Sequence, residues 1–185
     1  MQDAILEEFE EKMEKSVHHL MDQLRSIRTG RASPALVETI KVDYYGAMTP
    51  VNQLAQISVP EARQLLVKPF DVSVIKELER AILKSDLGLT PANDGKMIRL
   101  TLPPLSEEQR VKLVGKVREL TEAAHVALRN ERREANKHAD QAQKDGDISE
   151  DNNRVLHEKI QEALKKAESR LDEVLQKKTA EIMEE

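Results

Sequence analysis

The chain has 185 residues, of which 34 are acidic and 29 basic, and a formal net charge of −5. It has no cysteine, which excludes disulfides, thiolate metal sites and a cysteine nucleophile and is typical of a reducing compartment. No apolar run approaches the roughly 20 residues of a membrane-spanning helix, and the acidic start MQDAILEEFEEK predicts neither a secretory signal nor a transit peptide. With 34% charged and 2% aromatic residues, the composition favours long helices. We expect a cytoplasmic protein.

The seven prolines divide the chain, because all of them lie between residues 34 and 104. Proline breaks helix interiors, so the flanks can form long helices on either side of a different middle. We expect a discontinuous helical domain of residues 1–29 and 106–185, with an inserted domain of residues 30–105. Hinges are expected near residues 29–31 and 103–105, at Thr29, Gly30, Arg31, Pro103, Pro104 and Leu105.

The first flank carries an apolar stripe at helical spacing. The stripe contains Leu6, Phe9, Met13, Val17, Leu20, Leu24 and Ile27. Its members recur at steps of three and four residues, which predicts one amphipathic helix. Thr29-Gly30 follows the stripe, and Gly30 is a natural stop for the helix.

The second flank predicts two more helices. Ser106-Glu-Glu-Gln109 is a capping box that begins a helix running towards Gly146, about 60 Å long at 1.5 Å per residue. Asp147-Ile-Ser-Glu150 offers a new cap, and a further apolar stripe follows it. Three helices that are each apolar on one side can bury those sides together. We therefore predict a long three-helix bundle.

The insert reads as a small α/β domain, which makes the whole chain α+β. The strand signals are the short apolar or alternating runs at 40–44, 65–67 and 98–102. Asn93-Asp94-Gly95 predicts a turn just before the last of them. Between the second and third strands lies a helical pattern, with Ser73 as its expected cap and Gly88 as its expected stop.

Spacing argues against the enzyme motifs that the chain partly matches. Gly88–Lys96 has six residues between its glycines where a phosphate-binding loop has four, and Met97 stands in place of the metal-binding hydroxyl. His157-Glu158 begins like a zinc-protease helix, but Gln161 stands where the second histidine should be, which favours a surface histidine. We expect no catalytic residue, no bound metal and no cofactor.

Three arginines, Arg129, Arg132 and Arg133, lie within five positions of the second flank. At about 100° per residue they share one helix face, beside the apolar seam and pointing out, while Glu131 and Glu134 point elsewhere. Such a run can be a solvated face with i, i+4 partners. Arginine rather than lysine favours phosphate binding, because the planar guanidinium matches phosphate geometry. With few aromatic residues to stack on bases, a nucleic-acid partner would be structured and bound through its backbone.

Several long segments resemble the ribosome recycling factor family. They are IRTGRASPAL, YYG, NQLAQISVPEAR, SDLGLTPANDGKMIRLTLPPLSEEQR and VALRNERREAN, in this order. The similarity covers nearly the whole chain, and its weakest part is the end, KKTAEIMEE. The resemblance implies an L-shaped molecule in which two short linkers join the bundle to the α/β domain. It also implies a translation factor, not an enzyme, that splits post-termination ribosomes into subunits together with elongation factor G and GTP.

The resemblance also implies the partners. In the family the bundle lies along the rRNA of the large ribosomal subunit, so the expected RNA-binding residues are Arg28, Arg31, Arg129, Arg132 and Arg133. Release of mRNA and tRNA would free the ribosome for another round of initiation in protein biosynthesis. We expect the ribosome and elongation factor G as partners, no membrane, and a monomer. From the residues alone, a helical adaptor that binds proteins through its bundle surface and an enzyme in the insert stay open as alternatives.

Overall fold

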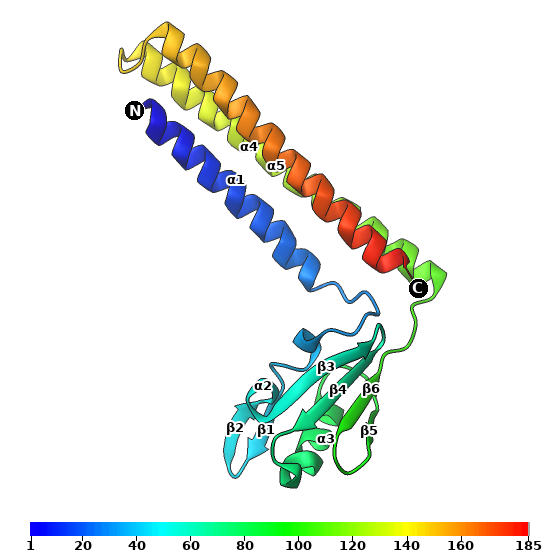
Figure 1. Ribbon diagram of the computed structural model, residues 1–185. Helices are drawn as coiled ribbons and strands as arrows, with labels where there is room; N and C mark the ends of the chain where they lie inside the picture. Colours follow the sequence, from blue (N-terminus) through cyan, green and yellow to red (C-terminus); the bar gives the residue numbers. More distant parts are fainter. Residues whose placement is uncertain (185) are drawn as a thin grey trace. The chain divides into compact units, whose positions relative to one another are not determined.

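The computed structural model describes residues 1–184, which form two compact units (Figure 1). The first unit contains Met1–Thr29 and the chain from Glu107 onward, and the second contains Gly30–Ser106. Three long helices make up the first unit, and both β-sheets lie in the second. Within residues 1–184, no helix has both the length and the apolar character that crossing a membrane requires.

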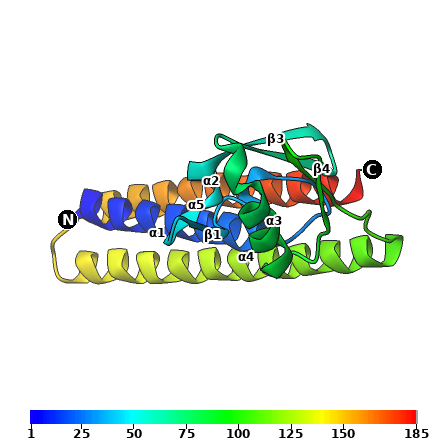
Figure 2. The ribbon, with the colours of Figure 1, turned by 90° about the horizontal axis from the view of Figure 1, so that it is seen from below.

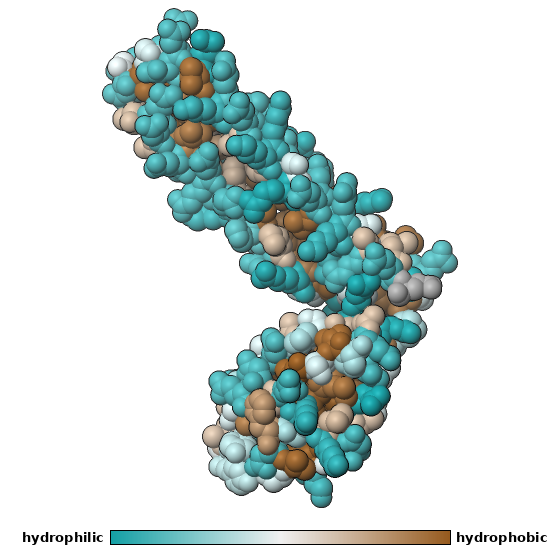
Figure 3. All heavy atoms as spheres, viewed as in Figure 1, coloured by the Kyte–Doolittle hydropathy of each residue, from teal (hydrophilic) through white to brown (hydrophobic). Residues whose placement is uncertain are grey.

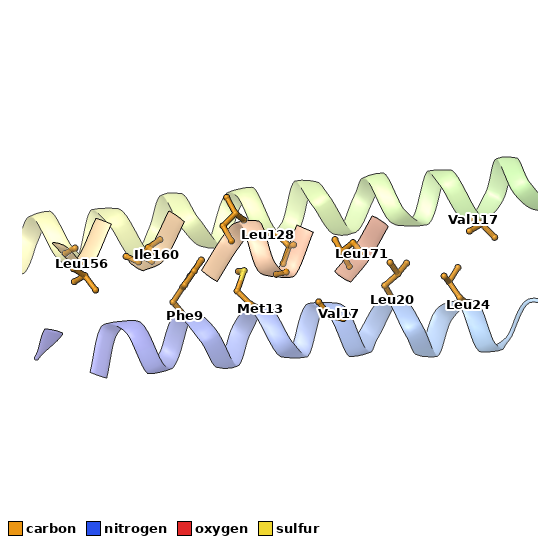
Figure 4. Close-up of a cluster of buried hydrophobic side chains, with 14 of the residues drawn as sticks. Phe9, Met13, Val17, Leu20, Leu24, Val117, Leu128, Leu156, Ile160 and Leu171 are labelled. Carbon is orange, nitrogen blue, oxygen red and sulfur yellow. The ribbon is translucent and has the colours of Figure 1, made fainter. Parts of the chain in front are cut away.

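The first unit is a bundle of α1 (Gln2–Arg25), α4 (Glu107–Lys144) and α5 (Glu150–Met183), which run side by side in Figure 2. Figure 4 shows the apolar stripe of α1 pointing toward buried residues of the other two helices. Among the most deeply buried side chains of this core are Phe9, Val17, Leu20, Val117, Leu128, Leu156, Ile160 and Leu171. Each helix buries one side in the shared core, which confirms the predicted three-helix bundle.

The helix ends depend on short polar side chains. The predicted stop of the first helix at Gly30 is wrong, because α1 ends at Arg25. Ser26 follows as the C-cap, and its hydroxyl donates to the Gln23 carbonyl at 2.6 Å, a local bond that competes with helix continuation. Ile27 still packs against the bundle core, so the apolar stripe continues beyond the helix that it predicts.

The two later helices begin and end close to their predicted positions. α4 begins directly after Ser106 and has 38 residues, about 57 Å at 1.5 Å per residue. It ends two residues before Gly146, whose φ of 83° is the left-handed conformation typical of a helix end. Within the predicted cap segment, Ser149 Oγ accepts the Asn152 backbone N–H at 3.2 Å and α5 starts at the next residue.

The second unit combines an antiparallel hairpin, a four-stranded antiparallel sheet and one main helix (Figure 1). The hairpin pairs β1 (Lys41–Tyr44) with β2 (Ala47–Pro50). In the larger sheet the order is β3 (Ala55–Glu61), β4 (Gln64–Pro69), β6 (Ile98–Thr101) and β5 (Pro91–Asn93). The helices are α3 (Ile75–Lys84), which packs against β1 and β5, and the single turn α2 (Val51–Leu54). Two 3₁₀ turns lie at Pro34–Leu36 and Val72–Val74. Together with the bundle, this unit confirms the α+β class.

The strands with strong alternation were predicted correctly, and the weakly patterned ones were missed. β1, β4 and β6 coincide with the predicted runs, and Leu65 pairs with Leu100 in the buried centre of the sheet. β2, β3 and β5 were not predicted. β3 is exposed over most of its length and contains Pro60, and β5 starts at Pro91; proline is tolerated at edges and strand starts but weakens a strand signal.

In the insert the predicted turn is confirmed, whereas the predicted ends of the helix are wrong. The turn at Asn93-Asp94-Gly95 is confirmed, since Asn93 Oδ1 accepts the Gly95 N–H at 2.8 Å. The helix cap is not Ser73 but Asp71, whose Oδ1 accepts the Ser73 N–H at 2.9 Å and opens a 3₁₀ turn before α3. The helix stops at Lys84 rather than at Gly88.

Candidate nucleic-acid interface

Two of the three clustered arginines are exposed on α4, and the third is not. Arg129 and Arg133 are exposed as predicted, whereas Arg132 is half-buried. The difference follows from helix geometry, because Arg132 comes four residues after the fully buried Leu128 and so lies close to the seam. The prediction that the whole cluster points outward is therefore wrong for Arg132.

Arg129 lies on the surface and is bound by an acidic neighbour. Its Nη2 is 2.6 Å from Glu122 Oε1 on the same helix, and its side chain is 45% exposed. An exposed ion pair of this kind gains little free energy, because water screens both charges. The pair can therefore be exchanged for a phosphate at small cost.

Arg132 reaches across the bundle surface to α5. Its Nη1 donates to Gln161 Oε1 at 3.2 Å. Its Nε and the Oδ1 of Asn136, one turn further along α4, are buried and have no hydrogen-bond partner among the described residues. Arg132 is thus held by a neutral amide and keeps its full positive charge.

The acidic residue next to Arg132 in the sequence is turned toward the other side of the helix. Glu131 Oε2 lies 3.4 Å from Lys12 Nζ of α1. This agrees with the helical spacing, which predicts that Glu131 points away from the arginine face. No carboxylate in residues 1–184 forms an ion pair with Arg132 or Arg133. The patch, which we define as Arg129, Arg132 and Arg133, therefore stays positive on an acidic protein.

Beyond the patch, a polar network joins α4 to α5 near the loop between them. Asp140 Oδ1 accepts from Asn153 Nδ2 at 3.0 Å and lies 2.9 Å from His157 Nε2. Hydrogen bonds from Asn153 and then from His157 lower the pKa of Asp140. His157 is a partly exposed side chain that also links the two helices.

Arg28 and Arg31 lie on opposite sides of the boundary between the units. Arg28 is exposed and follows the end of α1 in the first unit, and Arg31 is half-buried at the start of the second. The patch lies about a hundred residues later in the sequence, on α4. That Arg28 and Arg31 bind RNA together with the patch stays a prediction.

The linker residues have defined environments within their own units. Thr29 Oγ1 donates to Glu181 Oε1 at 3.1 Å, which ties the end of the first segment to α5. Gly30 has φ 77°, and a Cβ there would meet Leu105 Cγ at 3.1 Å, so both its conformation and its neighbour favour glycine. Pro103 and Pro104 are exposed and lie in a stretch without regular structure. Their role as hinges stays a prediction.

The C-terminal segment, where the family resemblance is weakest, is part of the bundle. Helix α5 continues to Met183, and Ile182 is 1% exposed within the core. Arg110 Nη1 of α4 also donates to the Met183 carbonyl at 3.4 Å. Ile182 was not predicted from the sequence as a core residue.

Besides the patch, a ligand-binding groove and a metal site are the other kinds of functional site to consider. A surface groove of about 490 Å³ in the second unit is lined by charged residues of β1 and α3, including Lys41, Asp43 and Lys84. Two more of its lining residues, Glu77 and Arg80, bind each other at 3.1 Å. No group of three or more His, Asp or Glu residues that could hold a metal occurs in the part of the chain that the structure describes.

Comparison with known proteins agrees with this architecture over the full chain. The family model "Ribosome recycling factor" matches residues 20–183. The ribosome-recycling factor of Listeria monocytogenes serotype 4b (strain F2365) is 50% identical over 184 residues, with 100% of both chains covered. Those of Desulfosudis oleivorans and Geobacillus kaustophilus are each 47% identical over 184 residues, again with complete coverage of both chains.

Solved structures give the same result. The solution structure of a ribosome recycling factor matches with a TM-score of 0.76 and 39% identity, covering 98% of this chain and 97% of the other. A second match is from models of the T. thermophilus ribosome recycling factor and the E. coli elongation factor G bound to the E. coli post-termination complex; its TM-score is 0.65, its identity 39% and its coverage 99% of both chains. The similarity includes the C-terminal segment. The chain belongs to the ribosome recycling factor family.

Proposed function

We propose that this protein binds the post-termination ribosome and, with elongation factor G and GTP, promotes its dissociation into subunits and the release of mRNA and tRNA. The observation that carries the proposal is full-length similarity to ribosome recycling factors, through both units and to the last turn of α5. A relative in complex with a post-termination ribosome and elongation factor G gives it direct support. The protein is a translation factor and not an enzyme; GTP hydrolysis belongs to elongation factor G.

The patch on α4 is the proposed contact with rRNA of the large subunit. Guanidinium groups form short, charge-assisted and often bidentate hydrogen bonds with phosphates. Among residues 1–184, Arg132 and Arg133 have no carboxylate partner, and Arg129 has an exposed one that phosphate can replace. The net charge of −5 opposes unspecific binding to nucleic acid, so a local patch selects RNA of the right shape.

Arg28 and Arg31 are proposed as further RNA contacts near the boundary between the units. We also propose that Thr29–Arg31 and Pro103–Leu105 act as the hinges of the two domains, residues 1–29 with 106–185 and residues 30–105. Gly30 provides backbone freedom on one linker, while Pro103 and Pro104 stiffen the other. The α/β domain could then move while the bundle stays bound.

The alternative of a protein-binding helical adaptor has less support. Such an adaptor needs a continuous apolar strip on the bundle surface. Figure 3 shows mostly hydrophilic residues over the visible face of the helices. The exposed large apolar residues of the bundle are Met1, Val111, Val126 and Met183, which form no stripe along any one helix.

The test of the proposed contact is co-sedimentation with purified 70S ribosomes at two salt concentrations. Arg133→Ala should weaken binding at low salt, and the loss should shrink as salt rises, because a screened phosphate contact is removed. Arg170→Ala is the matched control, since Arg170 is a partly exposed arginine of the same bundle, on α5, but binds Glu14 of α1. If both variants bind equally well, the patch does not contact rRNA. Light scattering with elongation factor G and GTP then measures subunit splitting.

A further inference from the structure

Arg132 differs from most paired cations of the bundle in the chemistry of its partner. Lys12, Lys15, Lys112, Arg129 and Arg170 all bind carboxylates. In a chain with 34 acidic residues this is the expected outcome. Arg132 instead donates to the side-chain amide of Gln161 on the neighbouring helix. Since arginine is a donor only, the amide oxygen is the atom that must face it.

A neutral partner has a different effect from a carboxylate. A carboxylate would fix the guanidinium but would also neutralise it, and a phosphate would have to displace the carboxylate. An amide oxygen fixes one Nη and leaves the net charge and the remaining donors for another anion. Arg132 Nε is buried and has no hydrogen-bond partner among the described residues, so an anion would have to bind this guanidinium through its Nη groups.

We propose that Gln161 is a positioning residue for RNA binding, which holds Arg132 at the contact between α4 and α5 in its charged form, ready for a phosphate. The inference rests on the proposed rRNA contact of the patch and extends the binding surface to a second helix. Gln161 lies 29 residues from Arg132 in the sequence, and both side chains are half-buried. The amide therefore acts through Arg132 and not as a cation of its own.

Two substitutions separate charge from position. Gln161→Glu places a carboxylate against Arg132, so low-salt affinity for 70S ribosomes should fall about tenfold, and the salt dependence should lose about one phosphate contact. Gln161→Met keeps the length and removes the acceptor; we expect a loss of about threefold with an unchanged salt dependence. Ser169→Glu is the control, because it adds the same charge at an exposed position two turns further along α5. It should bind within about twofold of the unchanged protein.

Arg132→Ala completes the experiment as a double-mutant cycle. Alone it should weaken binding about tenfold or more, and in this background Gln161→Met should have no further effect. If Arg132→Ala weakens binding while both Gln161 variants bind like the unchanged protein, the positioning role is wrong and the rRNA contact stands. If Arg132→Ala binds normally, the contact and the positioning role both fail. A Gln161→Met loss that persists without Arg132 also overturns the inference, because it would act through the fold. Circular dichroism melts check that each variant is folded.

Discussion

Ile182→Ala should destabilise the helical unit by about 2–3 kcal/mol. Ile182 is 1% exposed and lies in the bundle core, although only one residue of α5 follows it. Replacing a buried isoleucine by alanine costs about 2–5 kcal/mol, from lost burial and from the cavity that remains. We expect the lower half of this range, because the last turn of a helix can close over part of the cavity.

Met183→Ala is the matched control for this experiment, since Met183 is the next residue and is 47% exposed. Its replacement should change the free energy of unfolding by about 0.5 kcal/mol or less. At about 4–8 °C per kcal/mol for a domain of roughly this size, Ile182→Ala should melt roughly 10–20 °C below the unchanged protein in a circular dichroism scan. Equal melting temperatures for the two variants would refute the reasoning, because they would show that the last turn of α5 adds nothing to the core.

Further predictions concern the separate parts of the fold. Residues 1–29 and 106–185, joined by a short turn, should fold as a bundle with a cooperative melt; a gradual loss of helix would contradict this. Gly30→Ala should lower the urea stability of the second unit by roughly 1–2 kcal/mol, because its φ of 77° and a nearby leucine disfavour a Cβ. Ser149→Ala should cost about 1 kcal/mol through the lost N-cap, measured by the same method. The lowered pKa of Asp140 means that its stabilisation is present above the ordinary value of about 3.9 and is lost as the pH falls further. The melting temperature of Asp140→Asn should therefore depend less on pH between about pH 5 and 2 than that of the unchanged protein. An unchanged dependence would show that ionised Asp140 does not stabilise the fold.

Periodicity predicts the bundle because its signal repeats over many turns. The stripe of α1 and the cap segment 147–150 are local patterns; the stripe predicts the helix, and the segment contains Ser149, the cap that begins α5. Sequence patterns fail to predict an element where a single hydrogen bond, or a neighbour distant in the sequence, decides the structure. Ser26 ends α1 through one hydroxyl bond, although the apolar stripe continues to Ile27. Strand β5 starts with Pro91, which is acceptable only because the strand lies at the edge of the sheet.

The candidate site also has one part that local spacing predicts and another part that depends on helix packing. The helical wheel predicts that the three arginines lie beside the seam, because their spacing is local. It cannot predict that Arg132 binds Gln161, since that contact needs the packing of α4 against α5. In the sequence, Gln161 has meaning only as the residue that replaces a zinc ligand. Likewise, the link between His157 and Asp140 exists only after the two helices have been brought together.

The discontinuous bundle has a consequence for the order of events during synthesis. Glu14 of α1 pairs with Arg170, 156 residues later, and Thr29 binds Glu181, 152 residues later. At roughly 5–20 residues per second, the second half of this core leaves the translating ribosome about 8–30 s after the first. During this interval the α/β unit has its whole sequence available and can fold. The apolar stripe of α1, in contrast, has no partner helix to cover it until α4 and α5 are made, so the native packing of the helix made first waits for the helix made last.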